Sequence, residues 1–194
     1  MKRFMIAVLF LSVAFSSAHA SEIGEDGLHK ESWFALTFKD VAEDIASANE
    51  EGKRLAIIIE QRGCIYCKKL HEEVFSDPEV YNFIKENFVV VQYNMFGDEE
   101  VTDLDGDVLS EKNAIRKWRA VFTPTILFMP DTIDPSLDAG SAAVEIMPGA
   151  FGKWTTLNMF RWVMEKGYET NEHFQKYHAR IISQLRKEGK ISSD

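Results

Sequence analysis

The amino-acid sequence predicts a single α/β domain in which one sheet is covered by helices on both faces. An apolar run at 55–59, rich in isoleucine and bounded by charged residues, is typical of a central strand buried on both sides. Three further apolar runs, at 88–93, 126–129 and 142–147, alternate with segments of helical periodicity. A β-α-β unit followed by a β-β-α unit can build one such sheet. The 194 residues, 45% of them hydrophobic, suffice for the core of one domain.

The predicted helices are segments in which apolar residues recur every three or four positions. Gly52 ends the first of them, Asp77-Pro78 begins the third, and Gly167 ends the fifth. The polar stretch at 21–31 is expected to be a loose lead-in, and the acidic stretch at 96–110 a solvated, mobile loop. The helices are expected at 40–51, at 68–75, from 77 onward, and at 111–120, 154–166 and 172–187, the last being an added C-terminal helix.

The first twenty residues have the pattern of a secretory signal peptide. Lys2 and Arg3 give a positive start, the apolar stretch Phe4–Phe15 follows, and Ala18-His19-Ala20 provides small residues for cleavage before Ser21. The apolar stretch is too short to span a bilayer, which needs about 20 residues. We therefore expect a periplasmic or secreted protein without stable membrane insertion, in a compartment where disulfides are permitted.

Charge and cysteine content exclude several classes of protein. With 22 Lys+Arg and 31 Asp+Glu the net charge is −9, which argues against nucleic acid as a partner. Two cysteines exclude a disulfide-rich scaffold and a four-cysteine zinc site. The acidic stretch does not follow the calcium-binding EF-hand pattern, because Val101 and Lys112 occupy positions that require carboxylates. We expect no metal ion.

The most informative motif is the Cys64-Ile65-Tyr66-Cys67 segment at the junction of a buried strand and a helix. Unpaired N–H groups at a helix N-terminus stabilise a thiolate, so Cys64 is predicted to be the exposed nucleophile. Cys67, one turn further in, is predicted to be the resolving thiol. Such a pair can exchange disulfides in either direction. The Cys64–Cys67 disulfide is then itself the redox group, and no diffusible cofactor is needed.

Three other uses of the cysteines fit the sequence less well. A purely structural disulfide gains little from so short a loop. A metal site with the C-x2-C-x3-H spacing of Cys64, Cys67 and His71 lacks a fourth ligand, and His71 is expected to face solvent on its helix. Covalent haem attachment requires a histidine at the position of Lys68 and is excluded.

In two segments the chain resembles the thioredoxin superfamily. These are Gly63-Cys64-Ile65-Tyr66-Cys67-Lys68-Lys69 after the first strand and Phe122-Thr123-Pro124-Thr125-Ile126-Leu127-Phe128 before a later one. The resemblance covers roughly 33–167 and implies a thioredoxin fold, a central mixed sheet flanked by helices. The stretch 67–78 is similar to that of secreted thioredoxin-like reductases, including the SoxW-type thioredoxin of bacterial sulfur-oxidation operons.

The resemblance assigns further roles. It implies a cis Thr123–Pro124 bond, with the backbone of Thr123 and Pro124 turned toward the cysteines to bind an extended substrate peptide. It also implies net reduction of protein disulfides, with electrons supplied by a membrane thiol transporter. The corresponding division of the chain is signal peptide 1–20, lead-in 21–32, thioredoxin-like domain 33–167 and C-terminal extension 168–194.

The sequence departs from the thioredoxin pattern around the cysteines. Gly63 stands where cytoplasmic thioredoxins have tryptophan, and Ile58 stands where the family has a buried aspartate that accepts the proton of the second cysteine. Glu60 is the nearest acid and a candidate substitute. The alternative is that Glu60 simply ends the strand in solvent. Two alternatives to a reductase also remain at this point: a disulfide oxidase or isomerase, and a non-catalytic binding module with the same fold.

Overall fold

Strand β3 (Arg54–Glu60) lies at the centre of the sheet that organises the computed structural model, which describes residues 22–191. The sheet has four strands in the order β4-β3-β7-β8; β3 pairs in parallel with β4 (Phe88–Asn94) and antiparallel with β7 (Thr125–Phe128). Strand β8 (Glu145–Pro148) pairs antiparallel with β7 at one edge. The predicted signal peptide lies outside the described residues.

The remaining elements cover this sheet or extend from it. The helices are α1 (Val41–Glu50), α2 (Ile65–Lys69), the π-helix η1 (Leu70–Phe75), α3 (Pro78–Asn87), α4 (Glu111–Lys117), α5 (Ala139–Ala142), α6 (Lys153–Met164), the 3-10 helix η2 (Gly167–Glu169) and α7 (Phe174–Lys187). Two hairpins are formed by β1 (Glu22–Ile23) with β2 (His29–Lys30) and by β5 (Glu100–Thr102) with β6 (Val108–Ser110).

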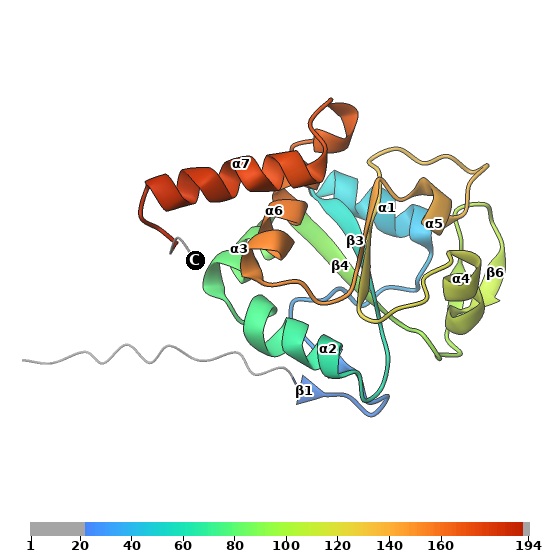
Figure 1. Cartoon of the computed structure of the whole chain (residues 1–194). Coiled ribbons are helices and arrows are strands. Elements are labelled where there is room, and N and C mark those ends of the chain that lie inside the picture. Colours follow the sequence, from blue (N-terminus) through green and yellow to red (C-terminus); the bar gives the residue numbers. More distant parts are fainter. Residues whose placement is uncertain (1–21, 192–194) are drawn as a thin grey trace, which may run out of the picture.

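The two faces of β3 belong to two separate apolar clusters, which is why its run of residues is apolar throughout. Ile57 and Ile59 pack toward α1 and α4, whereas Ala56 and Ile58 pack toward η1, α3 and α6. In the cluster that contains Ala56 and Ile58, Phe160 of α6 packs edge-on against the ring of Phe128 on β7. The fold predicted from the sequence, a mixed sheet flanked by helices with an added C-terminal helix, is confirmed; Figure 1 shows α7 lying across the domain beside α6.

The prediction of an irregular, solvated loop at 96–110 is wrong. This segment forms the β5–β6 hairpin, and the carboxylate of Asp103 is buried within it. Asp103 accepts hydrogen bonds from the indole of Trp118 at 3.0 Å and from the backbone N–H of Ala139 at 2.9 Å, and it pairs with Lys117. From its local sequence, the Asp103 carboxylate was expected to hydrogen-bond to water. In the structure its hydrogen bonds are made by partners on α4 and α5 instead.

The last sheet strand also begins later than predicted. Residues 139–142 form the short helix α5, which Asp138 caps. Strand β8 starts at Glu145, the residue that pairs with Phe128 of β7. No helix between residues 22 and 191 is long and apolar enough to cross a membrane.

Candidate functional site

Cys64 and Cys67 form a disulfide at the start of α2. Cys64 is the N-cap residue, and its sulfur accepts a hydrogen bond from the Cys67 backbone N–H at 3.0 Å. Gly63, just before it, has a φ of +72°, a conformation that glycine adopts without strain and that lets the chain turn from the loop into the helix. Cys64 is 9% exposed and Cys67 only 1%, so Cys64 is the more accessible of the two sulfurs.

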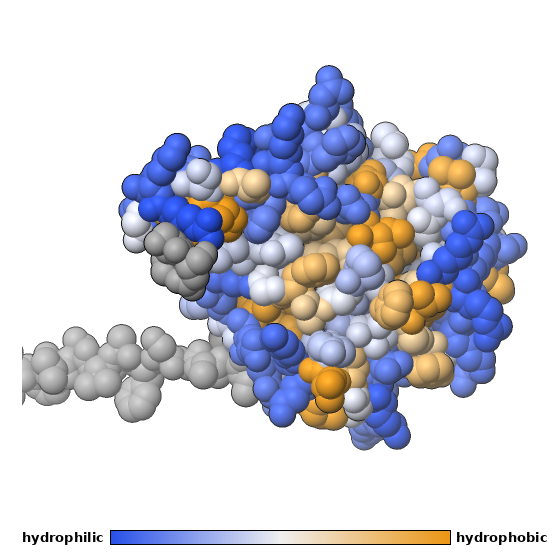
Figure 2. Space-filling view, viewed as in Figure 1, coloured by the Kyte–Doolittle hydropathy of each residue, from blue (hydrophilic) through white to orange (hydrophobic). Residues whose placement is uncertain are grey.

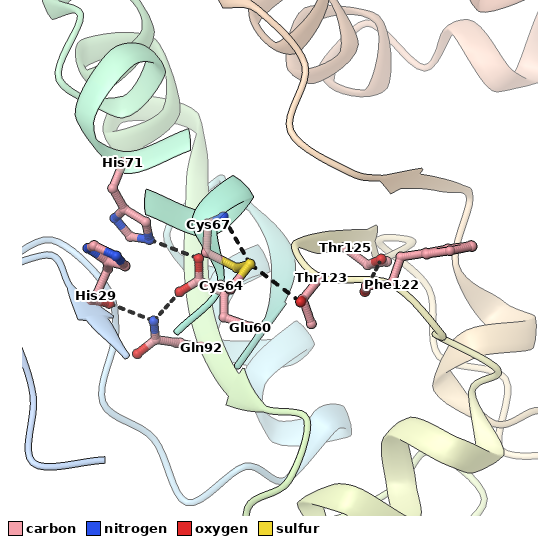
Figure 3. Close-up of a disulfide and its surroundings, with 9 residues drawn as sticks. All are labelled: His29, Glu60, Cys64, Cys67, His71, Gln92, Phe122, Thr123 and Thr125. Carbon is pink, nitrogen blue, oxygen red and sulfur yellow. Dashed lines mark hydrogen bonds and ion pairs between the residues drawn. A yellow bond between two sulfur atoms is a disulfide. The ribbon is translucent and has the colours of Figure 1, made fainter. Parts of the chain in front are cut away.

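The loop before β7 lies against the disulfide. The Thr123–Pro124 peptide bond is cis, and the Thr123 hydroxyl donates to the Cys64 sulfur at 3.4 Å. The carbonyl of Pro124 accepts from the N–H of Gly149 at 2.7 Å, which ties the loop to the end of β8. Figure 3 shows this loop on one side of the disulfide and a group of polar side chains on the other.

An open apolar groove of about 420 Å³ is lined in part by Thr123, whose hydroxyl contacts the Cys64 sulfur. Tyr66 and Phe122 line it and are well exposed, at 59% and 64%. Its far wall is formed by 148–150. In Figure 2, apolar surface is gathered around this part of the molecule, whereas the flanks of the same view are hydrophilic. The groove therefore offers an apolar surface to a partner that approaches Cys64.

Glu60 lies on the other side of the disulfide and is completely buried, which excludes the interpretation that it ends the strand in solvent. Its side chain is on the same face of β3 as that of Ile58, two residues earlier, and this face packs toward η1. One carboxylate oxygen pairs with Nε2 of His71 at 3.0 Å, and the other accepts from the Gln92 amide. The strand thus supplies a buried carboxylate two residues after Ile58, the position at which the thioredoxin pattern has its aspartate.

The prediction that His71 faces solvent is wrong. Its side chain is buried, and its two ring nitrogens contact two carboxylates: Nδ1 lies 2.8 Å from Glu31 and Nε2 lies 3.0 Å from Glu60. Burial by itself lowers the pKa of His71, but the hydrogen bonds and charges of the two carboxylates outweigh it and raise the pKa to about 9. The imidazole is therefore a cation at neutral pH, donating from both nitrogens.

Glu31 comes from the segment predicted to be a loose lead-in, and that prediction also needs correction. The segment forms the β1–β2 hairpin, and Glu31, which follows it, is held by the Trp33 indole N–H at 3.2 Å as well as by His71. Gln92 donates to the backbone carbonyl of His29 and to Glu60, which links the hairpin to the sheet. The N-terminal segment is thus part of the wall of the site.

The sequence analysis considered His71 only as a metal ligand and did not identify Glu31 at all. His71 follows Cys67 by four residues, which places both on the inner face of one helix. Glu31 had no local signal, because its partner is 40 residues away. Among the described residues no cluster of His, Cys, Asp and Glu could hold a metal ion: the sulfurs are bonded to each other, and His71 is occupied by carboxylates.

The comparisons with known proteins agree with this geometry. The family model of the thioredoxin-like domain matches residues 41–133. A thioredoxin-fold protein from Helicobacter pylori superposes with a TM-score of 0.51 at 17% identity, over 80% of this chain and 98% of that one. The chain has the thioredoxin fold.

Two other solved structures align with lower TM-scores. A thioredoxin from Thermus thermophilus aligns with a TM-score of 0.49 at 23% identity, covering 66% of this chain and 86% of that one. The C-terminal domain of Neisseria meningitidis DsbD in the oxidised form gives a TM-score of 0.45 at 15% identity, over 66% and 96%. The search of curated proteins found no match. Over residues 41–133 the chain is similar to the thioredoxin-like domain family, and the superposition shows the thioredoxin fold.

Within this thioredoxin fold, the position of the family's buried aspartate is taken by an apolar residue. Ile58 is fully buried in the cluster that includes Leu70 and Val74. A carboxylate there would have no hydrogen-bond partner in an apolar core. The carboxylate of Glu60, two residues later, is instead buried with a cation and an amide as partners.

Proposed function

We propose that the protein is a thiol–disulfide oxidoreductase that exchanges disulfides with protein substrates through Cys64 and Cys67. The observation that carries this proposal is the asymmetry of the pair. Cys64, the more exposed of the two cysteines, contacts Thr123, which lines the apolar groove, whereas Cys67 is closed off from solvent. One cysteine can thus meet a bulky partner, and the other can reach only the first cysteine.

The reaction transfers two electrons from the cysteine pair to the substrate. The Cys64 thiolate attacks a substrate disulfide, a Cys64–substrate disulfide forms, and the first substrate sulfur leaves as a thiolate. Cys67 then loses its proton and attacks the Cys64 sulfur. The Cys64–Cys67 disulfide forms, and the second substrate sulfur leaves and is protonated. The backbone of Thr123 and Pro124 is proposed to hold the substrate strand during both steps.

Glu60 is proposed as the acceptor of the Cys67 proton. Its carboxylate is buried and pairs with His71, and Cys67, which is also buried, lies four residues before His71 in the chain. In Figure 3 the carboxylate lies between the His71 ring and the disulfide. General base catalysis requires an acceptor placed close to the proton that it takes up, and Glu60 is the buried carboxylate on this side of the disulfide.

The proposed direction is reduction of substrate disulfides in the periplasm or outside the cell, with a dithiol donor such as a membrane thiol transporter restoring the reduced pair. The pair itself is the redox group, so no diffusible cofactor is proposed. The narrower resemblance to SoxW-type thioredoxins supports this direction.

The equilibrium reduction potential of the Cys64–Cys67 pair tests both the activity and its direction. Equilibration with glutathione buffers is expected to give a value near ~ −270 mV, as for thioredoxin. A value near ~ −120 mV would instead identify an oxidant. A pair that does not exchange at all, with a Cys64 thiol pKa near the free value of ~8.5, would identify a binding module with a structural disulfide.

The apolar groove predicts a preference for peptide disulfides over small ones. Phe122→Ala removes an exposed ring from the groove wall. We expect kcat/KM for a peptide disulfide to fall about 5- to 30-fold, the effect of losing roughly 1–2 kcal/mol of apolar contact. Reduction of hydroxyethyl disulfide, too small to fill the groove, should change less than about twofold.

The matched control is Val121→Ala. Val121 is the neighbouring residue, is 71% exposed and does not line the groove. Equal losses for Phe122→Ala on the peptide and on the small disulfide, or an equal loss for Val121→Ala, would contradict substrate binding in the groove.

A further inference from the structure

The charged group behind the disulfide consists of Glu31, His71 and Glu60, which we call the buried triad. All three side chains are at most 7% exposed. Ionised carboxylates only accept hydrogen bonds, so an imidazole with a carboxylate on each nitrogen must carry both protons. The triad then consists of one cation and two anions and has a net charge of −1.

The other groups around His71 do not cancel this charge. The ring of His29 stacks on that of His71 with centroids 5.0 Å apart. Burial lowers the pKa of His29, and the charge of His71 lowers it further, so His29 is neutral near pH 7. Phe34 and Phe75 contact the His71 ring, and neither carries charge. The nearby Gln92 is a neutral donor to Glu60.

We infer that the buried triad is an electrostatic element of the redox centre, which opposes ionisation of Cys64 in the reduced protein and so makes the pair a better reductant. The inference rests on the proposed function and adds to it a physical reason why the pair would reduce substrate disulfides. A disulfide is uncharged, whereas the reduced pair gains a negative charge when Cys64 ionises. A net negative charge buried nearby therefore destabilises the reduced state and leaves the oxidised state unaffected.

Glu31 has a specific place in this element. It does not contact Glu60 directly, because His71 lies between the two carboxylates. Its role is that of a positioning residue, which adds one negative charge and fixes the orientation of the His71 ring. The N-terminal segment, joined to the domain through Glu31 and Gln92, thereby takes part in setting the reactivity of Cys64.

The test measures the ionisation of Cys64 in the reduced full chain through its rate of alkylation by iodoacetamide between pH 5 and pH 9. Glu31→Gln removes one negative charge but keeps the shape of the side chain. At pH 6 His71 still has Glu60 as a partner and remains protonated, so the net charge of the triad rises to zero. We expect alkylation at pH 6 to become about threefold faster, with the whole profile moved to lower pH.

Two further variants separate charge from packing. Glu31→Asp keeps the charge, and its alkylation rate at pH 6 should stay within about twofold of the wild-type rate. Glu73→Gln makes the same charge change on η1, but this side chain is 63% exposed and paired with Lys69, so solvent screens it and the rate should also stay within about twofold. An unchanged or slower rate for Glu31→Gln, or an equal acceleration for Glu73→Gln, would overturn the inference.

Exchange with glutathione distinguishes failure of this inference from failure of the proposed function. If the wild-type pair exchanges normally and Glu31→Gln leaves the alkylation profile unmoved, only the role of the triad is wrong. If the wild-type pair does not exchange with glutathione at all, the proposed activity fails, and the inference fails with it.

Discussion

Cys64→Ser is expected to lower disulfide reductase activity by on the order of 1000-fold or more, because it removes the atom that forms the bond to substrate. Serine keeps the size and the N-cap position, so its hydroxyl can still accept from the Cys67 N–H. The loss would therefore report chemistry and not loss of structure. The measurement is the rate of reduction of a protein disulfide with a dithiol as electron donor.

Cys67→Ser is the matched variant and is expected to fail at the second step only. Cys64 can still attack, but the mixed disulfide with substrate is no longer resolved and should accumulate as a covalent adduct visible by mass spectrometry. Cys64→Ser should form no adduct. Full activity in Cys64→Ser, or an adduct located on Cys67, would exclude Cys64 as the nucleophile.

His71→Leu is expected to lower the free energy of unfolding by about 3–5 kcal/mol, the cost of removing one partner of a buried ion pair. The substitution leaves Glu31 and Glu60 as two buried carboxylates without a cation between them. Urea unfolding of the oxidised protein at pH 7 measures the loss. The control is His178→Leu: His178 bonds Asn158 on α6 and contacts no carboxylate of the triad, so a markedly smaller loss is expected.

The raised pKa of His71 predicts how the stability of the folded protein depends on pH. The pKa of His71 in the folded protein is about 9, above its ordinary value of 6.5, so the folded state holds this proton more tightly. Its contribution, roughly 3 kcal/mol, is fully present below pH 6.5 and is lost as pH rises through about 9. The wild-type protein should lose stability between pH 7 and pH 9.5, whereas His71→Leu should lose far less over that range. Parallel curves for the two proteins would contradict the assigned charge.

Local sequence pattern was sufficient for the parts of the site that the chain builds from neighbouring residues. Cys64 and Cys67 are three residues apart, and the apolar strand before them together with the helix after them fixes their position at a helix start. The central strand was predictable for a similar reason: an apolar run without alternation can only be buried on both faces. Glu60 was identified as a candidate by its proximity in sequence to Cys64.

The surroundings of Glu60 were decided by the tertiary structure. Whether a carboxylate at a strand end faces water or a cation depends on what packs above it, and here the partners are Gln92, 32 residues away, and His71, on the following helix. Glu31 reaches His71 from 40 residues away, and Thr123 reaches Cys64 from 59 residues away. The sequence by itself therefore determined the fold and the two candidate sulfurs. The buried charges proposed to act on them arise only when segments distant in the chain are packed together, because burial and ion pairing are properties of the assembled core.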